Sequence, residues 1–167
     1  MYIVSCAKGS TFELRHRNIN RSSSSSDKPP SDRVQQSRRA LTVLVTGGTG
    51  AIGSVVCEAL AARGHRVRSL DRSETGPDWG PAKSDAHSWE TVRCEITDAA
   101  AVREAARETD AIVHLAAYPE SADFLGTLLE PNVVGLYTIC EAGREAGTQR
   151  LVLASSGQVI FGHDWET

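Results

Sequence analysis

The sequence predicts an α/β fold, a doubly wound parallel sheet of about five strands with helices between them. Two observations carry this prediction. Short apolar, β-branched segments recur from residue 41 to residue 154, and most of the intervals between them hold apolar residues at helical spacing. Strands that alternate with helices pair in parallel, because parallel neighbours need long crossover connections, which are nearly always right-handed.

The first strand and the first helix have the clearest patterns. Leu41–Val45 is apolar, rich in β-branched residues and ends at glycines, which is typical of a strand buried on both faces. Apolar residues then recur at helical spacing from Ile52 to Leu60, and Gly64 lies where a helix C-terminus favours glycine. The remaining elements are expected as strands at 66–70, 91–96, 110–116 and 150–154, and as helices at 99–107 and 132–146.

Local signals mark the ends of the two later helices. Thr97 or Asp98 can cap the helix that begins at residue 99. Gly147 closes the last helix, and Asn132 follows Pro131 at its expected start, so a capping role competes there with a role in a functional site.

The first forty residues differ in composition from the rest of the chain. They hold eight Lys/Arg against three acids, the run Ser22–Ser26 and Pro29-Pro30, whereas the other 127 residues hold ten Lys/Arg against eighteen acids. A segment with so little apolar surface cannot offset its ordering entropy, so residues 1–40 are expected to be a disordered, basic, Ser-rich extension. An organelle transit peptide is the second interpretation, and a translation start assigned too far upstream is the third.

Composition also excludes several functional classes. No apolar run approaches the roughly 20 residues of a membrane span. The four cysteines are far apart, with no C-x-x-C pair and no histidine at ligand spacing, so no metal site is expected and a reduced, cytoplasmic protein is favoured. The acidic body argues against a nucleic-acid partner, since phosphate contacts need clustered Lys/Arg.

A glycine-rich turn follows the first strand directly. The segment Thr46–Gly53 satisfies both G-x-x-G-x-x-G and G-x-G-x-x-G spacing and leads into a helix. Glycines allow positive φ and a close approach of a pyrophosphate, while the helix N-terminus offers free N–H groups. The motif alone fits a tight turn without a ligand equally well.

An acidic residue at the end of the second strand favours the ligand. Asp71 lies 18 residues after Gly53, close to the ~20 expected for the carboxylate that binds the ribose hydroxyls of NAD. That carboxylate would repel a 2′-phosphate. Arg72 could hold one, so NADP is disfavoured rather than excluded.

These motifs resemble the extended short-chain dehydrogenase/reductase family, the NAD-dependent epimerase/dehydratase type. The resemblance rests on Leu44-Val-Thr-Gly-Gly-Thr-Gly-Ala-Ile-Gly53, Cys94-Glu-Ile-Thr-Asp98, Val113-His-Leu-Ala-Ala117, Asn132-Val-Val-Gly135 and Leu151-Val-Leu-Ala-Ser-Ser156, with Glu95 where the family usually has Asp. It implies a Rossmann-type NAD(P)-binding domain over residues 41–167. It also implies a cofactor site made of Gly47, Gly50, Ala51, Ile52, Gly53, Asp71, Arg72, Glu95, Ile96, Ala116, Ala117, Asn132 and Ser155.

Within the family, the later motifs are most similar to uronate and related sugar dehydrogenases. Those enzymes oxidise a sugar or uronic acid to a lactone and pass hydride to NAD. Ser156 corresponds to the catalytic serine if the chain is aligned as in uronate dehydrogenases, whereas the epimerase alignment puts Gly157 there. His114 lies on a predicted buried strand, where a core histidine is the expected role.

The family's catalytic Tyr-x-x-x-Lys pair does not occur in this sequence. Its tyrosines are Tyr2, Tyr118 and Tyr137, and none has a lysine four residues later. The domain is therefore expected to be incomplete at its C-terminus and inactive in hydride transfer, with the sugar substrate and the homodimer belonging to a longer parent. A sugar-nucleotide epimerase/dehydratase fragment and a non-catalytic NAD-binding interaction module are the alternatives.

Overall fold

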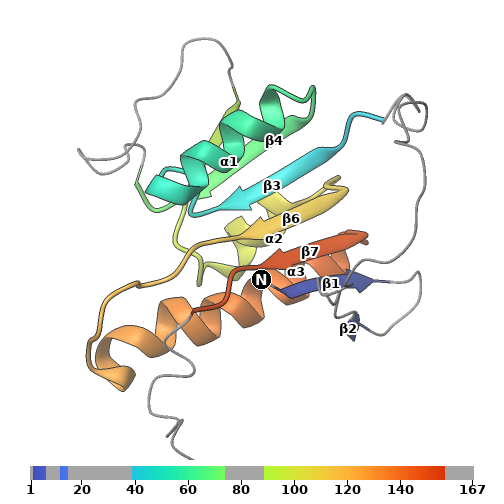
Figure 1. The fold of residues 1–167 in the computed structure, drawn as a ribbon. Coiled ribbons are helices and arrows are strands. Elements are labelled where there is room, and N and C mark those ends of the chain that lie inside the picture. The colour runs from blue at the N-terminus through green and yellow to red at the C-terminus, as the bar shows by residue number, and fades with distance from the viewer. Residues whose placement is uncertain (1, 7–11, 15–38, 74–88, 157–167) are drawn as a thin grey trace, which may run out of the picture.

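Five parallel strands form the centre of the molecule, as the sequence predicts (Figure 1). The computed structural model describes residues 39–73 and 89–156, and the backbone of residues 2–6 and 12–14. The parallel strands lie in the order β7-β6-β3-β4-β5. Their bounds are β3 Thr42–Thr46, β4 Arg66–Asp71, β5 Glu90–Arg93, β6 Ala111–His114 and β7 Arg150–Leu153.

Helices cover both faces of this sheet. Helix α1 (Ala51–Ala61) packs against β3 and β4 on one face, while α2 (Ala99–Ala106) and α3 (Gly135–Glu145) lie on the other (Figure 1). Alternate strand residues fill two separate cores, because successive side chains of a strand point to opposite faces. Leu44 packs in the core of α2 and α3, and its neighbours Val43 and Val45 pack in the core of α1.

The order of these strands creates a topological switch point. From β3 the chain continues to β4 and β5 on one side, then crosses back to β6 on the other side of β3. Doubly wound sheets bind ligands at the carboxyl ends of the two strands where the order reverses. Here those strands are β3 and β6, which pair in parallel from Val43↔Ala111 to Thr46↔His114.

Two antiparallel strands extend the sheet beyond β7. Strand β1 (Tyr2–Cys6) pairs with β7 from Tyr2↔Leu153 to Ser5↔Arg150, and β2 (Phe12–Leu14) pairs with β1. These two short strands are not among the elements that the sequence pattern predicts. Strand addition at an exposed edge uses backbone hydrogen bonds and needs no sustained apolar period, which is why the pattern did not predict it. Residues 1, 7–11 and 15–38 lie outside the described part of the chain.

Helical structure begins at Phe124, before the expected helix start at residue 132, although α3 itself begins at Gly135. Two short π-helical turns, η1 (Phe124–Leu128) and η2 (Glu130–Val134), lead directly into α3. Asp123 caps the first of them by accepting a hydrogen bond from the Gly126 N–H at 2.6 Å. π-Helical turns have i→i+5 bonding and no simple sequence period, so the pattern predicts only the part of this helical segment from Asn132 onward.

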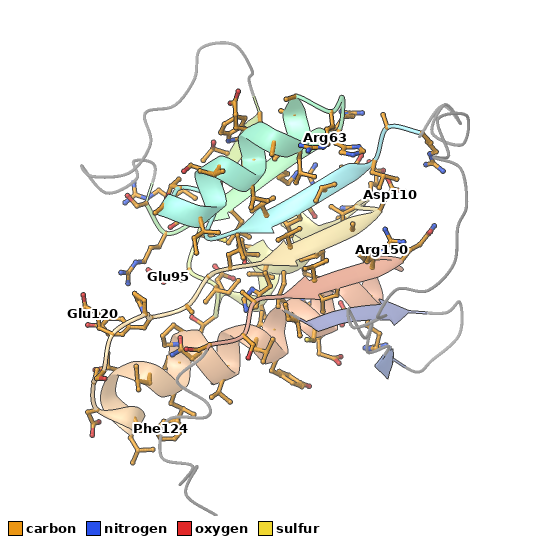
Figure 2. All side chains as sticks on the ribbon, in the orientation of Figure 1. Arg63, Glu95, Asp110, Glu120, Phe124 and Arg150 are labelled. Atoms are coloured by element: carbon orange, nitrogen blue, oxygen red, sulfur yellow. The ribbon has the colours of Figure 1, made fainter. Side chains whose placement is uncertain are left out.

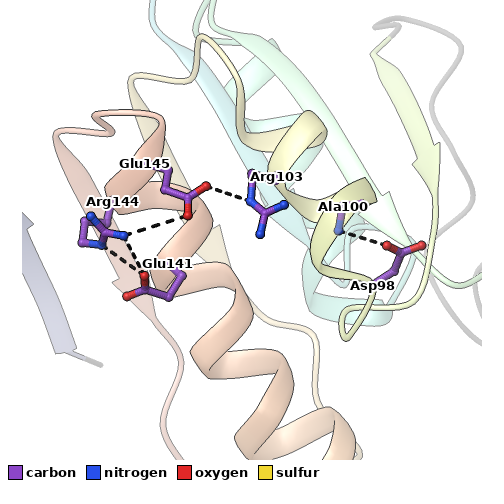
Figure 3. A network of polar contacts seen from close by, with 6 residues as sticks. All are labelled: Asp98, Ala100, Arg103, Glu141, Arg144 and Glu145. Carbon is purple, nitrogen blue, oxygen red and sulfur yellow. Dashed lines mark hydrogen bonds and ion pairs between the residues drawn. The ribbon is translucent and has the colours of Figure 1, made fainter.

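Polar contacts fix α2 against α3 (Figure 3). Arg103 Nε lies 2.7 Å from Glu145 Oε2 and joins the two helices. Asp98, rather than Thr97, caps α2 through hydrogen bonds from the N–H groups of Ala100 and Ala101. Because the Arg103–Glu145 pair is about half exposed, it orients the helices more than it stabilises them. None of the described helices is long and apolar enough to cross a membrane.

Candidate dinucleotide-binding site

A cavity of about 590 Å³ opens at the carboxyl ends of β3, β4 and β6, at the topological switch point. Glu95 lies at this end of the sheet, whereas Asp110 and Arg150 lie at the opposite end (Figure 2). The structure brings most of the predicted cofactor residues together here. Those that line the cavity are Gly47, Gly50, Ala51, Ile52, Gly53, Asp71, Arg72, Glu95, Ile96, Ala116 and Ala117.

The glycine turn forms one wall of the cavity. Gly47 has φ +70°, a conformation that side chains rarely adopt, and its N–H donates to the Leu70 carbonyl at 2.8 Å. A Cβ on Gly53 would lie 1.9 Å from the Gly47 carbonyl oxygen, so α1 can approach the turn only because residue 53 is glycine. Gly50 begins the helix without a side-chain cap. The first N–H groups of α1 thus face a cavity that suits an anion.

A carboxylate lies beside this turn. Asp71 ends β4, and its Oδ2 accepts a hydrogen bond from the Thr49 N–H at 3.1 Å, while Oδ1 accepts one from the Ser73 N–H at 3.3 Å. These bonds fix the carboxylate at the cavity wall and leave lone pairs on both oxygens. The neighbouring Arg72 is exposed and also lines the cavity.

The next wall follows β5. Ile96 is buried, and Gly135 at the start of α3 packs against it so closely that a Cβ there would lie 2.6 Å from Ile96 Cγ2. Glu95 is exposed. Cys94 lines the same wall, and the pKa of its thiol is raised by burial first and then by nearby carboxylates, including Glu95 and Asp71. This part of the cavity combines an apolar surface with negative charge, which disfavours a second phosphate.

Strands β3 and β6 are joined at their carboxyl ends by a buried hydrogen bond. Thr46 Oγ1 lies 2.7 Å from His114 Nδ1, and it also accepts hydrogen bonds from the N–H groups of Leu115 and Ala116 at 3.2 and 3.3 Å. Burial lowers the pKa of His114 to about 4, so its ring is neutral at physiological pH. The bond holds the start of the Leu115–Ala117 segment against the glycine turn.

Asn132 supports the cavity wall indirectly, by hydrogen bonds to the backbone of Tyr118. Its Oδ1 accepts a hydrogen bond from the Tyr118 N–H at 2.7 Å, and its Nδ2 donates to the Tyr118 carbonyl at 3.2 Å. Tyr118, Pro119 and Pro131 line the cavity, whereas Asn132 itself does not. It lies within η2 rather than at a helix start, so it is not a cap.

The two serines after β7 lie outside the cavity wall. Ala154 lines the cavity, and both Ser155 and Ser156 are exposed at the carboxyl end of the sheet. Gly157, the other candidate for the position of the catalytic serine, lies outside the described residues.

Several cavity and support residues were not predicted from the sequence. Thr49 contributes through its backbone N–H, which no side-chain pattern can signal, and Thr46 through a contact with a strand 68 residues away. Tyr118 carried a usable signal, because it follows the fourth predicted strand at its carboxyl end. Among residues 39–73 and 89–156, no three His, Cys, Asp or Glu side chains cluster as metal ligands.

Comparison with known proteins identifies relatives of the chain. Residues 43–166 match the NAD dependent epimerase/dehydratase family. Uronate dehydrogenase of Pseudomonas putida is 32% identical over 118 residues, which are 71% of this chain and 41% of that protein. The 3 beta-hydroxysteroid dehydrogenase/Delta 5→4-isomerase of Mycobacterium tuberculosis is 36% identical over 128 residues, which are 72% of this chain and 33% of that protein.

A solved structure gives the same assignment. A mutant of uronate dehydrogenase from Agrobacterium tumefaciens, complexed with NAD, superposes with a TM-score of 0.59 at 34% identity, over 70% of this chain and 41% of that one. The chain spans 33–41% of the length of these relatives. Because a single family matches from β3 to beyond β7, the resemblance found in the motifs is confirmed: the chain belongs to the NAD-dependent epimerase/dehydratase family.

Proposed function

We propose that the chain binds NAD in the cavity at the switch point, as the cofactor-binding part of an oxidoreductase that acts on a sugar or uronic acid. The observation that carries this proposal is the Asp71 carboxylate, fixed by the Thr49 N–H beside a glycine turn. A dinucleotide needs this combination of an anion site and a carboxylate acceptor for ribose hydroxyls. The glycine turn fits a pyrophosphate, because Gly50 carries no side chain to block the helix N-terminus.

Each wall of the cavity has a role in this proposal. The N–H groups of residues 51–53, at the start of α1, would hold the pyrophosphate, and Asp71 would accept from both hydroxyls of the adenosine ribose. Ile96 and Glu95 would contact the adenine, while Ala116 and Ala117 would border the second ribose. Ser155 follows β7 and does not line the cavity, so it would contact only a cofactor that extends past Ala154. The Asp71 charge favours NAD over NADP, since a 2′-phosphate would be repelled by it.

NAD supplies a hydride acceptor, and the rest of the reaction requires a base for the substrate hydroxyl proton. Ser156, just after β7, would supply one polar group for the substrate, but the sequence holds no Tyr-x-x-x-Lys pair. We therefore expect the 167-residue chain to bind NAD without hydride transfer. Oxidation of a sugar or uronic acid is proposed for the whole protein, on the similarity to uronate dehydrogenases.

Calorimetry tests the cofactor assignment. NAD and NADP are titrated into the wild-type chain and into Asp71→Ala, with the expectation that NAD binds the wild type more tightly than NADP does. Asp71→Ala should weaken NAD binding by about tenfold or more, because hydrogen bonds to a charged group contribute about 1.5–3 kcal/mol. An unchanged NAD affinity in Asp71→Ala would remove the assignment.

Asp110→Ala is the matched control for this experiment. Its carboxylate also accepts a hydrogen bond from a backbone N–H, that of Thr42 at 2.8 Å, but it lies at the opposite end of the sheet (Figure 2). A loss of NAD affinity in both variants would indicate general destabilisation. A loss in Asp71→Ala alone supports a ribose contact.

Absorbance of NADH tests the expected lack of turnover. The chain is mixed with NAD and with a panel of uronic acids, aldoses and nucleotide sugars. No NADH formation is expected. Turnover of a uronic acid would overturn the expected inactivity, and conversion of a nucleotide sugar without net NADH would favour the epimerase alternative. NAD binding without any turnover leaves the non-catalytic binding module to be tested by a search for partner proteins.

A further inference from the structure

His114 and Thr46 occupy the two strands that meet at the switch point. The register pairs Thr46 with His114 at the carboxyl ends of β3 and β6, and both side chains are almost fully buried, at 0% and 6% exposed. The residues that follow each strand, Gly47 and Leu115–Ala116, form adjoining parts of the cavity wall. A Cβ on Gly47 would lie 2.8 Å from the Ala116 nitrogen, so these walls already touch at their backbones.

Hydrogen-bond counting fixes the protonation of this pair. A hydroxyl group has one donor and two acceptor lone pairs. The N–H groups of Leu115 and Ala116 both point to Thr46 Oγ1 and occupy its lone pairs. The Thr46 proton is then left for His114, 2.7 Å away, so Nδ1 is the acceptor and the ring carries its proton on Nε2. A histidine protonated on Nδ1 would direct a third donor at an oxygen whose two lone pairs are already occupied.

The geometry points to His114 as a positioning residue for the cavity. By accepting the Thr46 proton, His114 orients the Thr46 hydroxyl so that its oxygen accepts from the N–H groups of Leu115 and Ala116. These two amides fix the cavity wall made by residues 115–117. The inference deepens the proposed NAD site and rests on it for the identity of the ligand. It differs from a merely filled core position, because the acceptor nitrogen, and not the volume of the ring, does the positioning. The His114 carbonyl also accepts from the Ala154 N–H at 3.2 Å, so a third wall depends on the same strand end.

Two substitutions separate the acceptor from the ring. His114→Leu replaces the ring with an apolar side chain of similar length, which offers no acceptor to Thr46. His114→Asn offers a side-chain oxygen near the position of Nδ1. Thr46→Val removes the hydroxyl and with it all three of its hydrogen bonds, so it shows the exchange to be expected when the Leu115 and Ala116 amides lose this acceptor altogether. The full chain is used in each case.

Two measurements report separately on the order of the cavity wall and on ligand binding. Amide hydrogen exchange is read by NMR at Leu115 and Ala116, and NAD affinity by calorimetry. In His114→Leu, exchange at Ala116 should rise about tenfold and the Kd for NAD should rise about fivefold to tenfold, in line with one net hydrogen bond. Exchange at Leu115 should rise less, because its N–H also donates to the Thr46 carbonyl at 3.1 Å. His114→Asn should return both values to within about twofold of wild type.

Thr109→Val is the control for general destabilisation. Thr109 is as buried as His114, at 5% exposed, and its hydroxyl donates to the Ala106 carbonyl at 2.7 Å, at the amino end of β6. This variant should lower stability but leave Ala116 exchange and NAD affinity close to wild type, once the loss of stability is taken into account.

Three results would overturn the inference. They are unchanged Ala116 exchange in His114→Leu, an effect in Thr109→Val as large as in His114→Leu, and nitrogen chemical shifts that put the ring proton on Nδ1. If the wild-type chain does not bind NAD, the proposed function falls by itself. The exchange and chemical-shift measurements then still decide whether His114 sets the cavity wall.

Discussion

Asn132 holds Tyr118 at the rim of the cavity with two hydrogen bonds, one from the Tyr118 N–H and one to the Tyr118 carbonyl. The two residues are 14 positions apart and are brought together by the π-helical turn η2, which turns the Asn132 side chain toward the segment after β6. An asparagine can make both bonds because its amide carries a donor and an acceptor. Asn132 thus fixes the backbone of a residue that lines the cavity without lining it itself.

Replacing Asn132 should therefore weaken the fold and the ligand site together. Asn132→Ala leaves the Tyr118 N–H and carbonyl without these partners in a half-buried position, so we expect a loss of about 1–3 kcal/mol in the free energy of unfolding, measured by urea denaturation. NAD affinity should fall several-fold.

The isosteric Asn132→Asp provides a sharper comparison. It keeps an acceptor for the Tyr118 N–H but loses the donor to the Tyr118 carbonyl, so it should lie between wild type and Asn132→Ala in stability. Gln149→Ala changes an exposed amide at the other end of the sheet and should be within about 0.5 kcal/mol of wild type. Equal stability of Asn132→Ala and Gln149→Ala would contradict a positioning role for Asn132.

A second prediction concerns the close approach of α1 to the glycine turn. In Gly53→Ala the new methyl group would lie 1.9 Å from the Gly47 carbonyl oxygen and 2.8 Å from Gly48 Cα, both backbone atoms that cannot move without opening the turn. We expect a loss on the order of 3 kcal/mol in the free energy of unfolding, from overpacking, and a loss of NAD binding.

Gly64→Ala separates steric contact from backbone strain. Gly64 has φ +79° at the end of α1, but nothing lies within 4 Å of its would-be Cβ. The expected loss is about 1–2 kcal/mol from the left-handed conformation alone, with NAD affinity unchanged. If Gly53→Ala is no less stable than Gly64→Ala in urea, the turn adapts and the steric argument is wrong.

Much of this architecture could be predicted because buried parallel strands leave a strong pattern. The segment Leu41–Val45 is apolar at every position except Thr42, and its observed strand is shifted by one residue, to Thr42–Thr46. The position of Asp71 relative to the glycines follows from the length of one helix and one strand, so the spacing in the sequence was enough to predict that this carboxylate lies beside the glycine turn. In each case, residues close in sequence carry the information.

Features that depend on distant segments could not be predicted in this way. Strand β1 pairs with β7 across most of the chain, and edge pairing leaves no period in the sequence. The helical segment from Phe124 to residue 131 was not predicted, since η1 and η2 have neither the 3.6-residue period nor a simple start signal. His114 was interpreted correctly as a core histidine, but its partner Thr46 lies 68 residues away and became visible only in the folded chain.

The buried His114 also predicts a dependence of stability on pH. Its pKa falls from the ordinary 6.5 to about 4 in the folded protein because burial disfavours the charged ring. Between these values the unfolded chain binds more protons than the folded one, so stability rises with pH across this window. The contribution is fully present above about pH 6.5 and is lost as the pH falls toward 4. At about 1.4 kcal/mol for each pKa unit, the total is on the order of 3 kcal/mol.

Urea denaturation of the wild type and of two His114 variants, repeated from pH 7 to pH 4, measures this contribution. Neither His114→Leu nor His114→Asn carries a titratable ring, so both should lose less stability than the wild type over that range, by about 3 kcal/mol. His114→Asn keeps an acceptor for Thr46, so the two variants should differ from each other by a constant amount at every pH. That constant difference isolates the hydrogen bond from the titration. Parallel curves for all three proteins would mean that the pKa of His114 is the same in the folded and the unfolded chain, and burial would then not keep the ring neutral in this pH range.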